Sequence, residues 1–204
     1  GPFWLYSVYQ LSDPSATTRI TAPVLWDTVE QRIVTNDAWE ILKLMSREAE
    51  QSDLIIFNDA LGAILKEGLF SSENMESIES MYLDLSSTVF NVEAVGIEIM
   101  TKHVKDIIGV NDEVQKIFTK LRELNDLLGK RRFLLGNNLT AVDIVLAMFL
   151  FRFDACYTPL FNLSNHEEYV GTILMGNLYP NLKAYSRELY QELKSTLKIQ
   201  GFRQ

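Results

Sequence analysis

The sequence predicts a mainly α-helical protein that begins with a short α/β segment. Both strand candidates, residues 24–26 and 32–34, lie within the first fifty residues, where short apolar runs are bounded by turn-forming residues. Beyond that point the apolar residues recur at helical spacing instead. We therefore divide the chain into a segment 1–50 and an all-helical segment 51–204.

The N-terminal segment starts with an aromatic-rich stretch, residues 3–11, whose secondary structure the pattern does not decide. A turn is predicted at Ser12-Asp13-Pro14, ahead of the two strands. Asn36 or Asp37 then caps a helix. The apolar residues of this helix suit one buried face: Trp39, Ile41, Leu42, Leu44 and Met45.

The remaining helices follow from apolar periodicity and from breaks at glycine and proline. They are expected at residues 53–66, 72–108, 111–128 after a break at Gly109-Val110, 140–156, 165–175 and 180–197. Thr140 and Asp143 form a capping arrangement that opens the most apolar of these helices. Because residues 144–151 are apolar on every side, we expect this helix at the centre of a bundle.

Composition excludes several classes of partner. The net charge of −8 argues against binding to duplex nucleic acid, which requires clustered Lys and Arg. The longest strongly apolar run, residues 144–151, is far shorter than the roughly 20 residues that a membrane span requires. His103 and His166 lie far apart and match no metal-ligand spacing. We therefore expect a cytoplasmic protein with no metal site.

Cys156 is the single cysteine of the chain, which fits a reducing compartment. It lies near the end of the apolar helix, one turn after Arg152. Burial raises the pKa of a thiol, and the C-terminal end of a helix disfavours a thiolate. We therefore predict a buried structural thiol rather than a nucleophile.

These features together resemble the glutathione transferases. The resemblance rests on Ala22-Pro23, similar to a cis-proline before a strand, and on the all-helical body with its capped, buried helix. Further landmarks resemble the Xi class, the glutathionyl-hydroquinone reductases. They are Asp13-Pro14, Arg19, residues 23–27, residues 152–157 with Phe161, and residues 179–182.

The resemblance implies an incomplete thioredoxin-like segment followed by the helical C-terminal domain of a glutathione transferase. It assigns glutathione, as a co-substrate, to Ala22, Pro23, Asp37 and Ala38. It assigns a small aromatic substrate to a pocket that contains Phe90, Tyr157 and Tyr179. It also implies a homodimer. In such enzymes a cysteine attacks the glutathionyl sulfur and releases hydroquinone, and a second glutathione regenerates the thiol.

The sequence departs from this family at several positions. The family's Cys-Pro-Trp sequence does not occur among the 204 residues, and we assign no catalytic residue to the chain. Ala38 replaces a serine whose hydroxyl would bind the glutathione carboxylate, and Phe90 replaces a tyrosine. Asn162-Leu163-Ser164 replaces Lys-Cys-Asn, which removes a positive charge.

Two hypotheses of different class stay open at this point. The first is a glutathione transferase of the glutathionyl-hydroquinone reductase type whose catalytic cysteine lies upstream of the printed residues. The second is a non-catalytic glutathione-transferase-like module used for interaction or dimerisation. The residues alone do not decide whether the protein is an enzyme.

Overall fold

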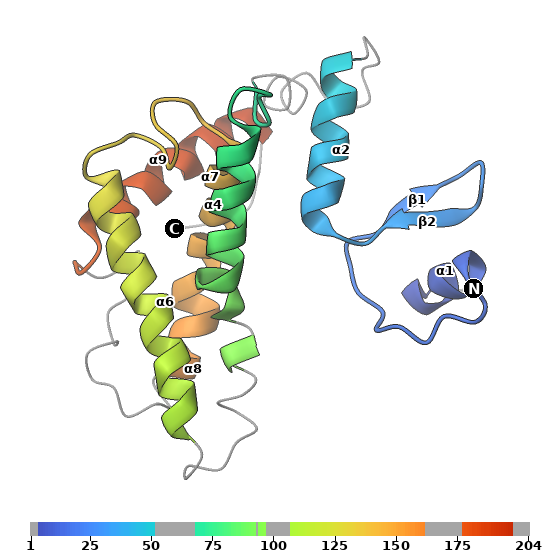
Figure 1. Ribbon diagram of the computed structural model, residues 1–204, viewed down its shortest axis with the longest axis horizontal. Helices are drawn as coiled ribbons and strands as arrows, with labels where there is room; N and C mark the ends of the chain where they lie inside the picture. Colours follow the sequence, from blue (N-terminus) through green and yellow to red (C-terminus); the bar gives the residue numbers. More distant parts are fainter. Residues whose placement is uncertain (1–3, 52–67, 93, 97–106, 162–176, 198–204) are drawn as a thin grey trace. The chain divides into compact units, whose positions relative to one another are not determined.

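The computed structural model is mainly helical, as predicted, with one two-stranded sheet (Figure 1). It describes residues 4–51, 68–92, 94–96, 107–161 and 177–197. The chain divides into one unit of residues Gly1–Glu67 and a second of residues Gly68–Gln204. The boundary predicted after residue 50 stays a prediction, because residues 52–67 lie outside the described residues.

The N-terminal unit contains a short helix, a hairpin and a longer helix. These elements are α1 (Leu5–Ser12), β1 (Leu25–Asp27), β2 (Arg32–Thr35) and α2 (Ala38–Gln51). The strands pair antiparallel, with Trp26 opposite Ile33, within one residue of the predicted bounds. The aromatic-rich start of the chain is therefore helical. Because α1 contacts β2, it supports the hairpin. A two-stranded sheet needs such support to be stable.

Unit 2 is a helical bundle. Its elements are α4 (Met75–Ser87), the 3-10 helix η1 (Val89–Asn91), α6 (Ile107–Leu128), α7 (Ala141–Arg152), the π-helical turn η3 (Phe153–Tyr157), α8 (Thr158–Phe161) and α9 (Pro180–Leu197). Helix α7 packs against both α4 and α9, and α6 packs against α9 and η1. The side chains of Leu146, Leu150 and Phe153 are fully buried. The predicted central position of the apolar helix is therefore confirmed, although Met148 on its outer face is half exposed.

Two predicted helix boundaries are wrong. The helix expected over residues 72–108 is interrupted at Thr88, whose hydroxyl donates to the carbonyl oxygen of Asp84 at 2.6 Å. Such a local bond competes with the helical backbone pattern and bends a helix. The expected break at Gly109-Val110 is absent, since α6 runs through both residues. A single glycine costs a helix only about 1 kcal/mol, which packing along α6 offsets. The helices expected over 53–66 and 165–175 lie outside the described residues.

The start of α7 is organised by the buried carboxylate of Asp143. Its oxygens accept the amide of Leu134 at 2.9 Å, the amide and hydroxyl of Thr140 at 2.9 and 2.7 Å, and the hydroxyl of Tyr185 at 2.8 Å. The predicted cap is thus confirmed, and it extends to α9 through Tyr185. Burial raises the pKa of Asp143, although the four donors oppose that shift.

The start of α9 is capped from α6. The side-chain oxygen of Asn125 accepts the amides of Asn181 and Leu182 at 3.0 and 3.3 Å, and the side chain of Asn181 donates to the Asn125 carbonyl at 2.9 Å. A Cβ atom at position 129 would lie 2.7 Å from the side-chain nitrogen Nδ2 of Asn181. Glycine at this position therefore lets the ends of the two helices approach.

Replacing Asp143 with alanine tests the polar centre of unit 2. We expect Asp143→Ala to lower the free energy of unfolding by about 3 kcal/mol, because buried donors lose a charged acceptor. Asp126→Ala, at an exposed site on α6, should change it by less than about 0.5 kcal/mol. Urea unfolding followed by circular dichroism measures both, and equal losses in the two variants would contradict the role assigned to Asp143.

A second prediction concerns pH. Burial, and after it the charge of Asp143, raises the pKa of Tyr185 well above its ordinary value. The unfolded chain therefore loses the Tyr185 proton first, and the stability that this residue contributes below pH of about 10 falls as the pH rises further. We expect the advantage of the wild type over Tyr185→Phe to shrink by about 1.4 kcal/mol per pH unit there. Urea unfolding at several pH values measures it, and a constant difference would contradict the assignment.

Candidate functional site

Ala22 and Pro23, two of the residues predicted to bind glutathione, lie in the loop before β1. The Ala22–Pro23 peptide bond is cis, in agreement with the resemblance, and both residues are exposed. Among the residues that the structure describes, none forms a hydrogen bond with the backbone of Ala22. Its N–H and carbonyl groups are therefore available to the backbone of a peptide ligand.

The N-terminal end of α2 presents the other two residues assigned to glutathione. Of the two predicted caps, Asp37 is the one used, since its Oδ1 accepts the amides of Trp39 and Glu40 at 2.8 and 2.9 Å. Its Oδ2 and the amide of Ala38 have no partner among the described parts of the chain. The end of α2 thus offers one carboxylate oxygen to a cation and, next to it, one N–H group to an anion.

A hydrogen-bonded cluster joins these two segments. The hydroxyl of Tyr9 donates to the carbonyl oxygen of Thr21 at 2.9 Å, and the side-chain amide of Asn36 donates to the Tyr9 hydroxyl and to the Thr21 hydroxyl oxygen, both at 3.0 Å. The hydrogen bond with the Thr21 side chain, followed by that from Asn36, holds the pKa of Tyr9 below its ordinary value. Thr21 precedes Ala22, and Asn36 precedes Asp37.

Sequence reasoning missed this cluster. Tyr9 lies in the aromatic-rich start, where no periodicity identified a helix, and 12 and 27 residues separate it from its partners. Its burial, with 7% of its surface exposed, follows from packing that a single sequence does not display. The one available signal was the turn at Ser12-Asp13-Pro14, which returns the chain after a short helix.

The residues assigned to the aromatic substrate lie in unit 2. The ring of Phe90 lies 5.6 Å from that of Phe149, and Phe149 stacks on Tyr157 at 5.5 Å with 17° between the ring planes. Phe90 and Tyr157 therefore belong to one aromatic cluster. Tyr179, at the turn before α9, is also buried, and its carbonyl oxygen accepts the amide of Lys183 at 2.9 Å. The role of all three residues in substrate binding stays a prediction.

The prediction that Cys156 is buried is wrong, because the structure exposes this residue. After Arg152 the helix widens into η3, where the amide of Thr158 donates to the carbonyl of Phe153 five residues earlier. A π-helical turn contains one residue more than an α-helical turn, because its hydrogen bond joins residues five apart instead of four. Phe153 and Tyr157 keep inward positions, and Cys156 between them faces solvent.

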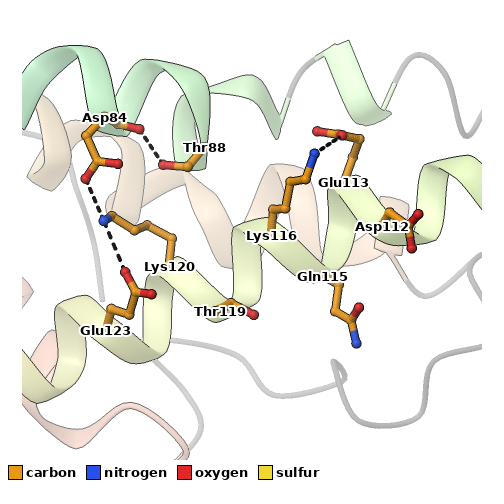
Figure 2. A pocket seen from close by; sticks show the side chains of 9 residues that line it. All are labelled: Asp84, Thr88, Asp112, Glu113, Gln115, Lys116, Thr119, Lys120 and Glu123. Carbon is orange, nitrogen blue, oxygen red and sulfur yellow. Dashed lines mark hydrogen bonds and ion pairs between the residues drawn. The ribbon is translucent and has the colours of Figure 1, made fainter.

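A groove of about 630 Å³ runs along α6 beside α4 (Figure 2). Figure 2 shows the Lys120 ammonium between Asp84 and Glu123, at 2.5 and 3.1 Å, while Lys116 pairs with Glu113 at 2.5 Å. The lining is entirely polar or charged and includes none of the residues assigned to a substrate. The Lys120 side chain is partly covered, whereas its acidic partners Asp84 and Glu123 are open to water, where ion pairs contribute little. We therefore interpret this groove as a solvated boundary between helices.

In the described ranges, no three His, Cys, Asp or Glu side chains gather in a way that could hold a metal ion. The same ranges contain no helix that is long and apolar enough to cross a membrane. The two histidines, His103 and His166, whose spacing matches no metal site, lie outside the described residues.

The family model described as "Glutathione S-transferase, C-terminal domain" matches residues 109–188. Glutathionyl-hydroquinone reductase YqjG of Escherichia coli is 31% identical over 190 residues, which cover 92% of this chain and 50% of that protein. Glutathionyl-hydroquinone reductase PcpF of Sphingobium chlorophenolicum is 32% identical, over 77% of this chain and 45% of that protein.

Solved structures agree. The glutathione-bound structure of YqjG matches with a TM-score of 0.73 at 28% identity, and the match covers 95% of this chain and 56% of the YqjG chain. The glutathione transferase Xi of Phanerochaete chrysosporium has a TM-score of 0.75 at 26% identity, with the same coverage. The chain spans about half the length of the curated relatives it matches.

The fold and these matches point to the glutathione transferase type: residues 109–188 match the C-terminal domain of that superfamily, and the chain is similar to its members over most of its length. Within the superfamily it is similar to the Xi class and to glutathionyl-hydroquinone reductases.

The exposure of Cys156 makes a direct prediction. We expect the folded protein to react with one equivalent of a chromogenic disulfide reagent at a rate within about tenfold of the urea-unfolded chain, because nothing in the described structure covers the thiol. Cys156→Ser should show no reaction. If the folded protein reacts several orders of magnitude more slowly than the unfolded chain, the thiol is buried, as the sequence predicted.

Proposed function

We propose that the protein takes part in glutathione-dependent reduction of glutathionyl-hydroquinones. Ala22, Pro23, Asp37 and Ala38 hold glutathione. Unit 2 contributes Phe90, Tyr157 and Tyr179 to the site of the aromatic substrate. The two curated relatives named above, YqjG and PcpF, are glutathionyl-hydroquinone reductases. Because the chain matches about half of their length, the reaction of the whole protein is part of the proposal.

One observation carries this proposal: two joined segments present polar groups that have no hydrogen-bond partner within the described ranges of the chain. These groups are the backbone of Ala22, Oδ2 of Asp37 and the amide of Ala38. Glutathione is a peptide with an α-amino acid group at its γ-glutamyl end. Its cysteinyl backbone pairs with Ala22, its ammonium group with Asp37, and its γ-glutamyl carboxylate with the Ala38 amide at the start of α2.

The reacting thiolate comes, in this proposal, from outside the printed residues. Cys156 lies in η3, inside a helical run that continues from α7 into α8, and not at the N-terminal end of that run, which is where a helix favours a thiolate. The chemistry requires a thiolate that attacks the glutathionyl sulfur, forms a mixed disulfide and leaves the hydroquinone carbon to take a proton. A second glutathione then attacks the mixed disulfide, which releases oxidised glutathione and restores the thiol.

Titration calorimetry with reduced glutathione tests the binding site. We expect one-site binding in the millimolar range or tighter, weakened about ten- to a hundredfold in Asp37→Asn, because the amide keeps the capping oxygen and loses the charge that pairs the ammonium group. Asp27→Asn is a matched control. Oδ1 of Asp27 accepts the amides of Val29 and Glu30 at 2.8 and 2.9 Å, the same arrangement at the hairpin turn.

Two results would count against the proposal. Equal affinity of the wild type and Asp37→Asn for glutathione would show that Asp37 does not pair with the ammonium group of the ligand. A folded wild type without detectable binding would favour the second hypothesis, a non-catalytic interaction or dimerisation module. The packing of Phe90 and Tyr157 against Phe149 is the observation that favours this alternative, since the rings already contact one another. Sedimentation analysis would then show whether the chain forms the dimer expected of such a module.

A further inference from the structure

The Tyr9 hydroxyl lies between the two segments that we assign to glutathione. It contacts the carbonyl of Thr21 on one side and the side-chain amide of Asn36 on the other, at 2.9 and 3.0 Å. Asn36 also donates to the Thr21 hydroxyl, so the three residues close a ring of hydrogen bonds. We infer that Tyr9 is a positioning residue that fixes the backbone of Ala22 relative to the N-terminal end of α2. This inference rests on the proposed function.

The peptide backbone connects the partners of Tyr9 to the groups assigned to glutathione. Thr21 and Asn36 each precede a predicted ligand-binding residue by one peptide unit, so a rotation of either residue moves the group that would contact glutathione. The contacts of Tyr9 fix both at once, because one hydroxyl donates to the first segment and accepts from the second. Displacement of a binding group by about 1 Å is enough to lose a well-aligned hydrogen bond.

A purely structural role predicts something different. Tyr9 is buried with 7% of its surface exposed, and α1, which carries it, contacts β2. Burial of the ring does not require the hydroxyl. Tyr9→Phe keeps this packing and removes only the hydrogen bonds. If the hydroxyl served stability alone, its loss would shift the unfolding midpoint and leave the affinity of the folded protein for glutathione unchanged.

Ser12 provides a matched control in the same helix. Its hydroxyl oxygen accepts the amide of Ile33 at 2.9 Å, so it also ties α1 to the hairpin. Among the hydrogen bonds of the described residues, none joins Ser12 to Thr21 or Asn36. Ser12→Ala and Tyr9→Phe each remove one hydroxyl of α1 that bonds outside the helix. Only Tyr9→Phe removes a link between the two assigned binding segments.

The experiment is calorimetric titration of reduced glutathione into the wild type, Tyr9→Phe, Ser12→Ala and Asn36→Ala, at a temperature where thermal unfolding shows each one folded. We expect Tyr9→Phe and Asn36→Ala to weaken binding about three- to tenfold and Ser12→Ala to leave it unchanged. The double variant Tyr9→Phe with Asn36→Ala should lose less than the product of the single losses, because both belong to one network. Amide nitrogen–proton spectra should show Ala22 and Ala38 shifted in unliganded Tyr9→Phe and unmoved in Ser12→Ala.

The outcomes separate this inference from the proposed function. Wild-type binding that Tyr9→Phe leaves unchanged refutes the positioning role and leaves the glutathione site intact. Equal weakening in Tyr9→Phe and Ser12→Ala shows general anchoring of α1, and also refutes it. A folded wild type that binds no glutathione refutes the proposed function together with this inference. Weakening confined to Tyr9→Phe and Asn36→Ala supports it.

Discussion

The buried carboxylate of Asp143 is the interaction on which the helical unit depends. It accepts four hydrogen bonds from Leu134, Thr140 and Tyr185, which lie before α7, at its cap and on α9. An unpaired charge at such a site would cost several kcal/mol, whereas a fully bonded one fixes the positions of its donors. The rest of α7 can then be almost entirely apolar, because the polar groups at its start are satisfied internally.

The aromatic interior follows from that anchor. With α7 fixed on α4 and α9, Phe149 reaches Phe90 on one side and Tyr157 on the other. The widening of the helix at η3 keeps Phe153 and Tyr157 inside the bundle. Tyr157 is therefore also part of the core, and Phe90, which is half-buried, packs on the same ring of Phe149. This packing contributes to stability whether or not a substrate binds.

The sequence predicted those features that local chemistry determines. Thr140 and Asp143 identified a cap by spacing alone, and Pro180 marked the first residue of α9. Long-range packing was not accessible in this way. The burial of Tyr9 and its bonds to Thr21 and Asn36 join positions 12 and 27 residues apart, and no local pattern encodes them. The predicted burial of Cys156 failed because the change from α-helix to π-turn depends on how the Phe153 and Tyr157 rings pack.

The chemistry of the N-terminal unit depends on how one carboxylate is divided between two tasks. Oδ1 of Asp37 satisfies two amides at the start of α2, so the negative charge of the side chain offsets the positive end of the helix dipole. A simple anion therefore gains less there than at an uncapped helix. A ligand that carries an ammonium group beside its carboxylate gains from Oδ2 and from the Ala38 amide together. Alanine at position 38 supplies no hydroxyl for that carboxylate, so the affinity of the proposed site would depend on the charge of Asp37 and on the placement of two backbone segments.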